Sequence, residues 1–412
     1  MKKQKNRIKV MLVSMSIILT FLVTGCSKSS KTVYNEAVSA YNKGDYQTAA
    51  TNFEKAIKMK DDDADYYIDY GFCLIALGDY EKAEQNFKRA ILDKNNVIVK
   101  RNNKKAYRGL GIMYYKQGNY DSAIQNLEKA FEYDSLKDYN MDIVSYIGSA
   151  YLAIGNYEKA LESFQTILEK DSNNTSARKS RAMVYLQLEK YEESIADFTQ
   201  VLEKSKKDYD AYIGLYQAYL ASGDTVNADA TLEKATRLEV KDENDKFQLA
   251  KIFYYQQNYD QAIEIMQEVS KEGIIESYLY LGDIYMQKGD NTSAMDSYEQ
   301  YLELNQGVNV LLYNKLSTCY LNTNHPKKAL KLVKKALELA SGSTKQNLLR
   351  NEIICYEQLG DYERALKKML SYISAYPEDE EAAKDLEFLK TRQVTEDSGD
   401  EGSESEPVIE KP

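Results

Sequence analysis

Hydrophobic and polar positions repeat one pattern between about residues 34 and 372. Each unit has a stretch with apolar residues three or four positions apart, a short polar turn similar to Gly-Asp-Tyr, and a second stretch of the same kind. Residues at this spacing share one face of a helix, so each unit predicts two amphipathic helices joined by a turn. The turns begin at Gly44, Gly78, Gly118, Gly155, Glu189, Gly223, Gln257, Gly289, Asn324 and Gly360. They are roughly 32 to 40 residues apart, which is the period of a helical repeat array.

The second helix of every unit carries a small residue five positions after the turn begins. These residues are Ala49, Ala83, Ala123, Ala160, Ser194, Ala228, Ala262, Ala294, Ala329 and Ala365. Four positions later comes a larger, mostly apolar residue: Phe53, Phe87, Leu127, Phe164, Phe198, Leu232, Met266, Tyr298, Val333 and Met369. Because a small side chain lets two helix backbones approach closely, we expect both positions to be buried in every unit.

The first helix has two markers of its own. Seven positions before the turn the residue is small in most units, and it is glycine at Gly71, Gly111, Gly148 and Gly282. Four positions before the turn it is aromatic in most units, as at Tyr151. Glycine inside a helix costs up to about 1 kcal/mol relative to alanine, so its recurrence indicates a close helix crossing.

The order small, aromatic, Gly-Asp-Tyr, alanine and large apolar resembles the tetratricopeptide repeat family over residues 32–377. Departures are local, since Glu189, Gln257 and Asn324 replace the turn glycine. The resemblance implies an all-α fold, a right-handed superhelical solenoid of about ten helix-turn-helix repeats. It also implies that the protein is not an enzyme and binds other proteins or peptides along its inner surface.

The first 25 residues have the features of a lipoprotein signal peptide. Five basic residues precede an apolar run from Val10 to Val23, which is shorter than the roughly 17–25 residues that span a bilayer. The string Val23-Thr24-Gly25-Cys26 resembles the lipobox of bacterial lipoproteins, which implies a lipid on Cys26 and cleavage before it. Residues 26–31 would form a short tether to the extracytoplasmic face of the cell membrane. A plain secretory signal and an uncleaved anchor are the alternatives.

The C-terminal end changes character twice. Asp379 to Leu389 predicts one more amphipathic helix, so residues 378–392 are expected to cap the last repeat. Residues 393–412 are acidic, contain glycine, serine and proline, and have no aromatic residue. Such a composition is typical of disorder, and we expect a solvated tail.

The charge balance bears on the class of partner. The net charge is −10, and the signal peptide contains five basic residues and no acid, so the processed chain is more acidic still. Proteins that bind nucleic acid have a clustered basic footprint, so nucleic acid is not an expected partner. One basic segment runs from Lys94 to Arg108 without an acid. It is either a solvated loop between repeats or a contact to lipid headgroups or a cell-wall polymer through Lys94, Lys100, Arg101, Lys104 and Lys105.

Reactive residues are few. Cys73, Cys319 and Cys355 share one position in the repeat, five residues before the turn, and are expected to be core residues. The single histidine, His325, lies in a turn. The acidic run Asp61 to Asp65 lacks the glycine of a calcium loop, so helix capping is its expected role. No catalytic residue, metal or cofactor is predicted.

A candidate partner-binding groove lies on the inner face of the first three units. Residues three and six positions before the turn are both apolar in successive units only there, which predicts a contiguous apolar patch. The proposed groove residues are Tyr34, Val38, Tyr41, Ile68, Phe72, Ile75, Arg108, Ile112 and Tyr115. The alternative is that neighbouring helices cover them. The sequence therefore favours a surface-anchored scaffold that binds segments of partner proteins, with a peptide- or glycan-capturing receptor as the alternative.

Overall fold

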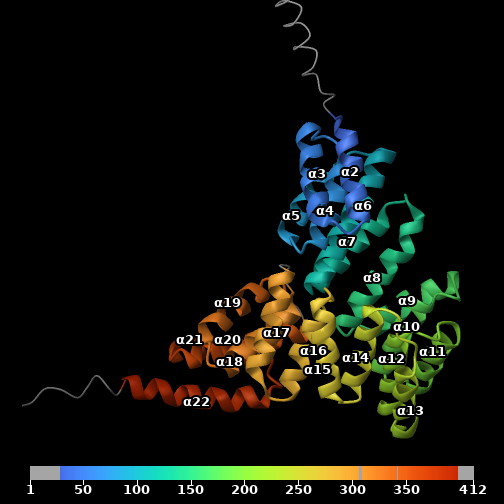
Figure 1. The fold of residues 1–412 in the computed structure, drawn as a ribbon. Coiled ribbons are helices and arrows are strands. Elements are labelled where there is room, and N and C mark those ends of the chain that lie inside the picture. The colour runs from blue at the N-terminus through green and yellow to red at the C-terminus, as the bar shows by residue number, and fades with distance from the viewer. Residues whose placement is uncertain (1–27, 306–308, 341, 398–412) are drawn as a thin grey trace, which may run out of the picture.

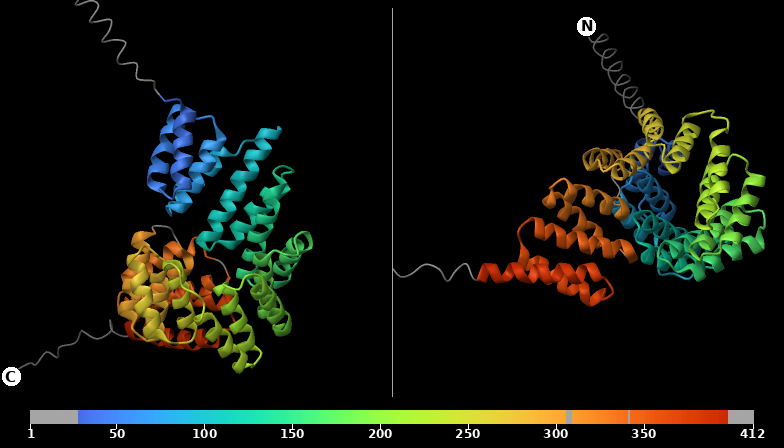
Figure 2. Two further views of the ribbon diagram at one scale, coloured as in Figure 1. Left: turned by 45° about the vertical axis from the view of Figure 1, so that its right-hand side comes forward. Right: turned by 90° about the horizontal axis from the view of Figure 1, so that it is seen from below.

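The computed structural model describes residues 28–305, 309–340 and 342–397, and these residues form helices and no strand. Within them ten pairs of helices follow one another, as the repeat pattern predicts, and the predicted all-α repeat solenoid is confirmed. Figure 1 shows the pairs stacked side by side, from the N-terminal units at the top to the last helix, α22 (Glu380–Asp397), at the bottom. The pairs curve, so that the later units return beneath the first ones, as both views in Figure 2 show.

The helix pairs have the following bounds. In the first five units they are α2 (Ser30–Asn42) and α3 (Tyr46–Met59), α4 (Ala64–Ala76) and α5 (Tyr80–Ala90), α6 (Val97–Gln117) and α7 (Tyr120–Glu132), α8 (Asn140–Ala153) and α9 (Tyr157–Lys170), and α10 (Thr175–Gln187) and α11 (Tyr191–Lys204). In the last five they are α12 (Tyr209–Ala221) and α13 (Thr225–Thr236), α14 (Glu243–Tyr255) and α15 (Tyr259–Lys271), α16 (Ser277–Gln287) and α17 (Asn291–Leu304), α18 (Val310–Asn322) and α19 (Pro326–Leu337), and α20 (Gly342–Gln358) and α21 (Tyr362–Ala375). A short helix η1 (Lys137–Tyr139) precedes α8, and α22 (Glu380–Asp397) follows the last pair.

The repeated small and large positions form the core. The ten small residues of the second helices are all 0% exposed, and the ten large residues are at most 1% exposed. The glycines of the first helices supply the space for the large residues. A Cβ at Gly111 would lie 2.4 Å from Leu127 Cγ, and one at Gly282 would lie 2.3 Å from a ring carbon of Tyr298. The predicted close helix crossing is therefore present.

All ten turn positions have left-handed backbone. The seven glycines have φ between 75° and 85°, and Glu189, Gln257 and Asn324 have φ of 57°, 59° and 59°. Helices commonly end in this conformation, which glycine adopts without strain. The backbone conformation of the turn is therefore the same in all ten repeats, whichever residue occupies it.

Two helices are longer than the sequence pattern predicts. The segment from Lys94 to Arg108 is mostly helix and not a loop, because α6 begins at Val97 and has 21 residues. Except for α20, which begins less than one turn later, the other first helices begin about two turns later relative to their own turns, so α6 extends roughly 10 Å beyond them. At the other end, α22 runs to Asp397 and so includes the first residues of the predicted tail.

Candidate functional site

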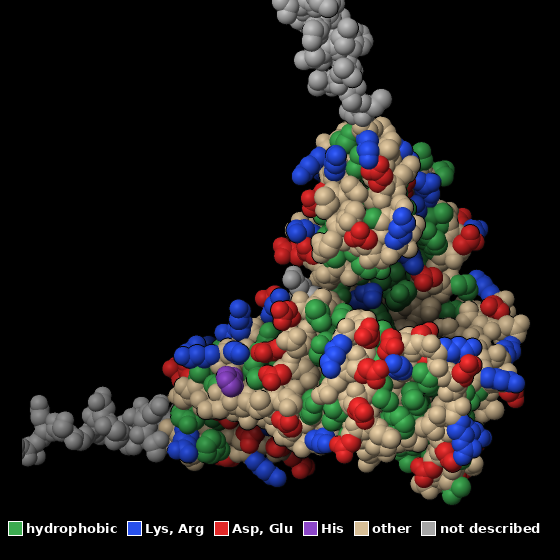
Figure 3. Space-filling view, viewed as in Figure 1, with side chains coloured by type: hydrophobic (Ala, Val, Ile, Leu, Met, Phe, Trp, Pro, Cys, Tyr) green, Lys and Arg blue, Asp and Glu red, His purple; other side chains and the backbone are tan. Residues whose placement is uncertain are grey.

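A hollow of about 980 Å³ lies on the inner side of the first three units. One wall comes from α2, α4 and α6, and the other from Ile275 and Glu276 before α16 and from Leu304 and Asn305 at the end of α17. These walls are far apart in the sequence and meet because the solenoid curves round. The two ends of the array also meet where the turn after α6 contacts the start of α18, since a Cβ at Gly118 would lie 3.4 Å from Val310 Cβ. Figure 3 shows the hollow between the upper and lower units, with hydrophobic and basic side chains inside it.

Six of the nine predicted groove residues line this hollow. Ile75 and Ile112 are 8% and 5% exposed, so they form the floor and offer little surface. The other four, Val38, Tyr41, Phe72 and Arg108, are half-buried and face the space. The structure thus brings together residues from three units that the sequence placed on one face.

The remaining three predicted residues do not line the hollow. Ile68 is 1% exposed and belongs to the core. The ring of Tyr34 stacks on Tyr66 at 4.5 Å between centroids, and its hydroxyl donates a hydrogen bond to the Asp69 carboxylate. Ile68 and Tyr34 therefore follow the alternative given by the sequence, in which neighbouring helices cover the side chains and leave no free surface for a partner.

Tyr115 is the third of these residues, and it supports the wall of the hollow from behind. It packs edge-to-face against Tyr120 and Tyr146, each 5.5 Å away between ring centroids. Tyr146 itself reaches the hollow. Tyr115 therefore positions a lining residue and is not one.

The charged groups around the hollow are of both signs. The Arg108 guanidinium donates to the Asp142 carboxylate of the next unit and lies 5.7 Å from the centre of the Phe72 ring. Asp69 accepts the Tyr34 hydroxyl, and burial raises the pKa of its carboxyl above the usual value. Lys116 and Glu276 are exposed on opposite walls. The hollow therefore combines an apolar floor with a rim of mixed charge.

Several lining residues were not found from the sequence. Tyr80 belongs to the repeated turn motif, which by itself indicates only a structural role, yet its side chain lines the hollow. The repeat pattern does not indicate which residues form the far wall of the hollow, because the position of that wall depends on the curvature of the whole array. The lining residues missed from the sequence are Asn42, Tyr46, Gln47, Phe53, Asp69, Ala76, Leu77, Tyr80, Lys116, Tyr146, Ile275, Glu276, Leu304 and Asn305.

The structure divides the predicted anionic contact into two parts. Lys104 is 0% exposed, and its Nζ donates to Tyr133 O at 3.1 Å and Asn140 Oδ1 at 2.5 Å, so it is not available to an external anion. Lys94 and Lys100 are exposed. Burial lowers the pKa of the Lys104 ammonium. The prediction for Lys104 is wrong because α6 packs this face against the linker before α8.

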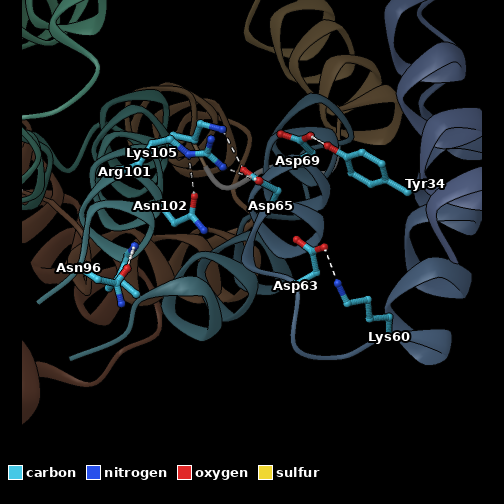
Figure 4. Close-up of polar contacts among 10 residues, drawn as sticks. Tyr34, Lys60, Asp63, Asp65, Asp69, Asn96, Arg101, Asn102 and Lys105 are labelled. Carbon is cyan, nitrogen blue, oxygen red and sulfur yellow. Dashed lines mark hydrogen bonds and ion pairs between the residues drawn. The ribbon is translucent and has the colours of Figure 1, made fainter. Parts of the chain in front are cut away.

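Two further basic residues of this segment bind an acid of the preceding unit. Arg101 Nη2 and Lys105 Nζ each contact an Asp65 carboxylate oxygen at 2.9 Å, as Figure 4 shows. The acidic run is thus used for ion pairing, and Asp63 pairs with Lys60 at 3.0 Å instead of capping α4 through its side chain. These contacts fasten α6 to α4.

The three described cysteines are free and buried, as the repeat register predicts. In residues 28–305, 309–340 and 342–397 there is no cluster of three or more His, Cys, Asp or Glu side chains placed to hold a metal ion. None of the helices in these ranges is both long and apolar enough to cross a membrane. Cys26 lies outside the described residues, as do residues 398–412 of the predicted tail.

The stacked helix pairs and their curved inner surface define the chain as a helical repeat solenoid, a class whose members typically act as scaffolds for other proteins. Family models described as tetratricopeptide repeat match residues 30–63, 62–135, 108–175, 185–245, 247–309, 311–342 and 354–379. The chain belongs to the tetratricopeptide repeat family. No curated protein sequence matches it.

Solved structures resemble the fold at low sequence identity. The APC/C hetero-tetramer Cut9–Hcn1 is 14% identical with a TM-score of 0.43, covering 92% of this chain and 81% of that one. Yeast Tom70 is 13% identical with a TM-score of 0.41, covering 90% and 97%. A tetratricopeptide repeat protein from Parabacteroides merdae is 18% identical with a TM-score of 0.39, covering 61% and 98%.

Proposed function

We propose that this protein is a lipid-anchored scaffold that binds a segment of a partner protein in the hollow between its first three units and its later units. The hollow itself is the observation that carries the proposal. Its volume of about 980 Å³ is at the upper end of the 300–1,000 Å³ range of small-molecule sites, so several side chains fit into it. A helical or extended segment in a groove is a recurring mode of peptide recognition.

The lining favours a segment with apolar side chains and both signs of charge. Val38 offers aliphatic surface above the buried floor of Ile75 and Ile112, and Lys116 and Glu276 stand on opposite walls of the rim. Burying apolar side chains of the partner supplies the affinity, and the charges supply orientation and specificity. The partner segment is therefore expected to be amphipathic.

Photocrosslinking in living cells tests this part of the proposal. Ala76 is the last residue of α4, is exposed and lines the hollow. Ala221 ends α12 at the same repeat position and is exposed away from the hollow. A photoreactive residue at Ala76 is expected to give a discrete protein adduct, and one at Ala221 none. The adduct should decrease at least about tenfold in a chain that also carries Val38→Arg, since a charge would stand in the apolar contact.

A receptor for glycans is the second candidate function. The tyrosines Tyr41, Tyr80 and Tyr146 line the hollow, and aromatic faces with hydroxyl groups suit sugar rings. This function predicts saturable binding of a glycan that Val38→Arg or Ala76→Arg abolishes, without a protein adduct at Ala76. A protein adduct at both Ala76 and Ala221 would contradict both functions.

Lipid anchoring at Cys26 is the other part of the proposal, and the lipobox-like string before Cys26 supports it. Helix α2 begins at Ser30, so a tether of a few residues, at about 3.3–3.6 Å each, would hold the first unit close to the membrane. Cys26→Ser is expected to leave the chain unprocessed or release it from the membrane fraction. If the variant is processed normally and stays on the membrane, the run from Val10 to Val23 is the anchor instead.

A further inference from the structure

The exposed large apolar side chains of the first three units gather on one edge of the molecule. In the described part of these units, every one of them lies where one unit joins the next: Met59, Leu92, Val97, Ile98 and Phe131. This edge contains the starts of the first helices and the ends of the second helices, because the two helices of a pair run in opposite directions. An exposed apolar cluster of this kind marks a contact surface.

The start of α6 is the most prominent part of this edge. Val97 and Ile98 are its first two residues and are 79% and 66% exposed. Because α6 starts about two turns earlier relative to its turn than the first helices of the other units, except α20, these side chains extend roughly 10 Å beyond the starts of those helices. We name residues 92–100 the α6 tip. No packing within the described structure accounts for two apolar side chains at the end of a projecting helix.

The described chain begins on the same edge. It starts at Lys28, two residues after Cys26, and α2 begins at Ser30. In Figure 1 this start lies at the top of the molecule, far from α13 and α22. A lipid on Cys26 would therefore turn the edge that carries the α6 tip towards the bilayer.

The charges of the tip suit an anionic surface. Lys94 and Lys100 flank the two apolar residues and are exposed, and Asp93 is the acid among residues 92–100. Figure 3 shows basic and hydrophobic side chains over the top of the N-terminal units, with acidic side chains among them. Apolar side chains that enter the boundary between headgroups and acyl chains, with lysines at headgroup level, are the general pattern of interfacial membrane binding.

We infer that the α6 tip is a second membrane contact, in which Val97 and Ile98 enter the bilayer interface and Lys94 and Lys100 bind anionic lipid headgroups. This inference rests on the proposed anchoring at Cys26, since the anchor holds the edge next to the bilayer. A single lipid attachment leaves a chain free to rotate about its tether. A second contact on α6, the helix that also lines the hollow with Arg108 and Ile112, fixes the direction in which the hollow faces.

A fluorescent label at two matched positions tests the inference. Val97 and Val226 are 79% and 78% exposed, but Val226 lies just after a turn, on the opposite edge. Val97→Cys and Val226→Cys of the full processed chain are labelled with an environment-sensitive dye and placed in vesicles of phosphatidylcholine with phosphatidylglycerol. The native thiols Cys73, Cys319 and Cys355 are buried, and burial raises their pKa, so they do not compete for the label.

The label at Val97 is expected to shift to shorter wavelength and to be protected from an aqueous quencher, while the label at Val226 stays accessible. Protection should weaken in vesicles of phosphatidylcholine alone. Lys94→Glu with Lys100→Glu should lower the association of the tip with the anionic surface by about 30-fold or more, since each lysine contributes about fivefold. If Val97 is as accessible as Val226 on the membrane, the inference is overturned.

Two outcomes separate this inference from its alternatives. If Cys26 of the unsubstituted chain takes up the dye, the proposed anchor is absent, and the tip is then tested by adding the same vesicles to the unanchored chain. Protection of Val97 by anionic vesicles in that case still supports the tip contact, and its absence refutes it. If Val97 is protected before any vesicle is added, the tip is covered by protein, and the membrane contact is overturned.

Discussion

Gly71 and Phe87 are in such close contact that a Cβ atom at Gly71 would lie 2.7 Å from two carbons of the Phe87 ring. Both residues belong to the second unit, sixteen positions apart, and Gly111 with Leu127 has the same relationship in the third. Phe87 also reaches the following unit, where a Cβ at Gly109 would lie 2.3 Å from its ring. One side chain therefore fixes the distance between two helices of its own unit and the distance to the next unit.

Gly71→Ala is expected to destabilise the protein by about 1–3 kcal/mol, because the added methyl group overpacks this crossing. Urea unfolding followed by circular dichroism measures the change. Phe87→Leu in the same chain should recover part of the loss, as residues in direct contact couple. Independent, additive effects of the two substitutions would show that the contact does not determine the crossing.

Glu189→Gly and Gln257→Gly are each expected to stabilise the protein by roughly 0.5–1 kcal/mol. Both residues have positive φ at a helix end. In this conformation a Cβ atom crowds the backbone carbonyl oxygen, and glycine avoids that cost because it has no Cβ. Gly223→Ala is the matched control: no atom lies within 4 Å of an added Cβ, so the φ of 85° alone should cost about 1 kcal/mol. Thermal melting of the three variants checks these signs. A lower melting temperature for both glycine variants would contradict the account.

Asp197→Ala is expected to cost about 3–5 kcal/mol, since removing one partner of a buried ion pair leaves a charge without compensation. The Asp197 side chain is 5% exposed, and Arg181 contacts it through Nε at 2.8 Å and Nη2 at 2.9 Å. This hydrogen bonding raises the pKa of Arg181. Asp229→Ala removes an exposed acid of α13 and should change stability by less than about 0.5 kcal/mol. Equal effects of the two substitutions in urea unfolding would refute the prediction.

Stability is expected to fall as the pH rises above about 9. Burial raises the pKa of Cys73 from 9.0 to about 11 and that of Tyr80 from 10.0 to about 12. Because the folded state favours the neutral forms, their contribution is complete below the unfolded pKa values and is lost as the pH rises through the folded ones. Melting temperatures between pH 7 and pH 12 measure this. Unchanged stability at pH 11.5 would mean that these groups are not buried.

The repeat core could be predicted residue by residue, whereas the site could be predicted only in part. Ala123 and Leu127 are buried because helical period and nearest-neighbour stacking decide their surroundings, and both are local properties. Lys104 shows the limit of such reasoning: its fully buried position depends on how the chain passes from α7 to α8, which leaves no mark in the composition of the segment.

The sequence by itself determined the ten helix pairs, the turns and the buried face of each helix, because each unit contacts chiefly its neighbours and repeats the same local pattern. The tertiary structure alone decided that Ile275 and Leu304 face Phe72 across a hollow, and that Asp65 binds Arg101 and Lys105. Such contacts depend on small rotations between successive units, which add up over the whole array. No single repeat contains the information that fixes their sum.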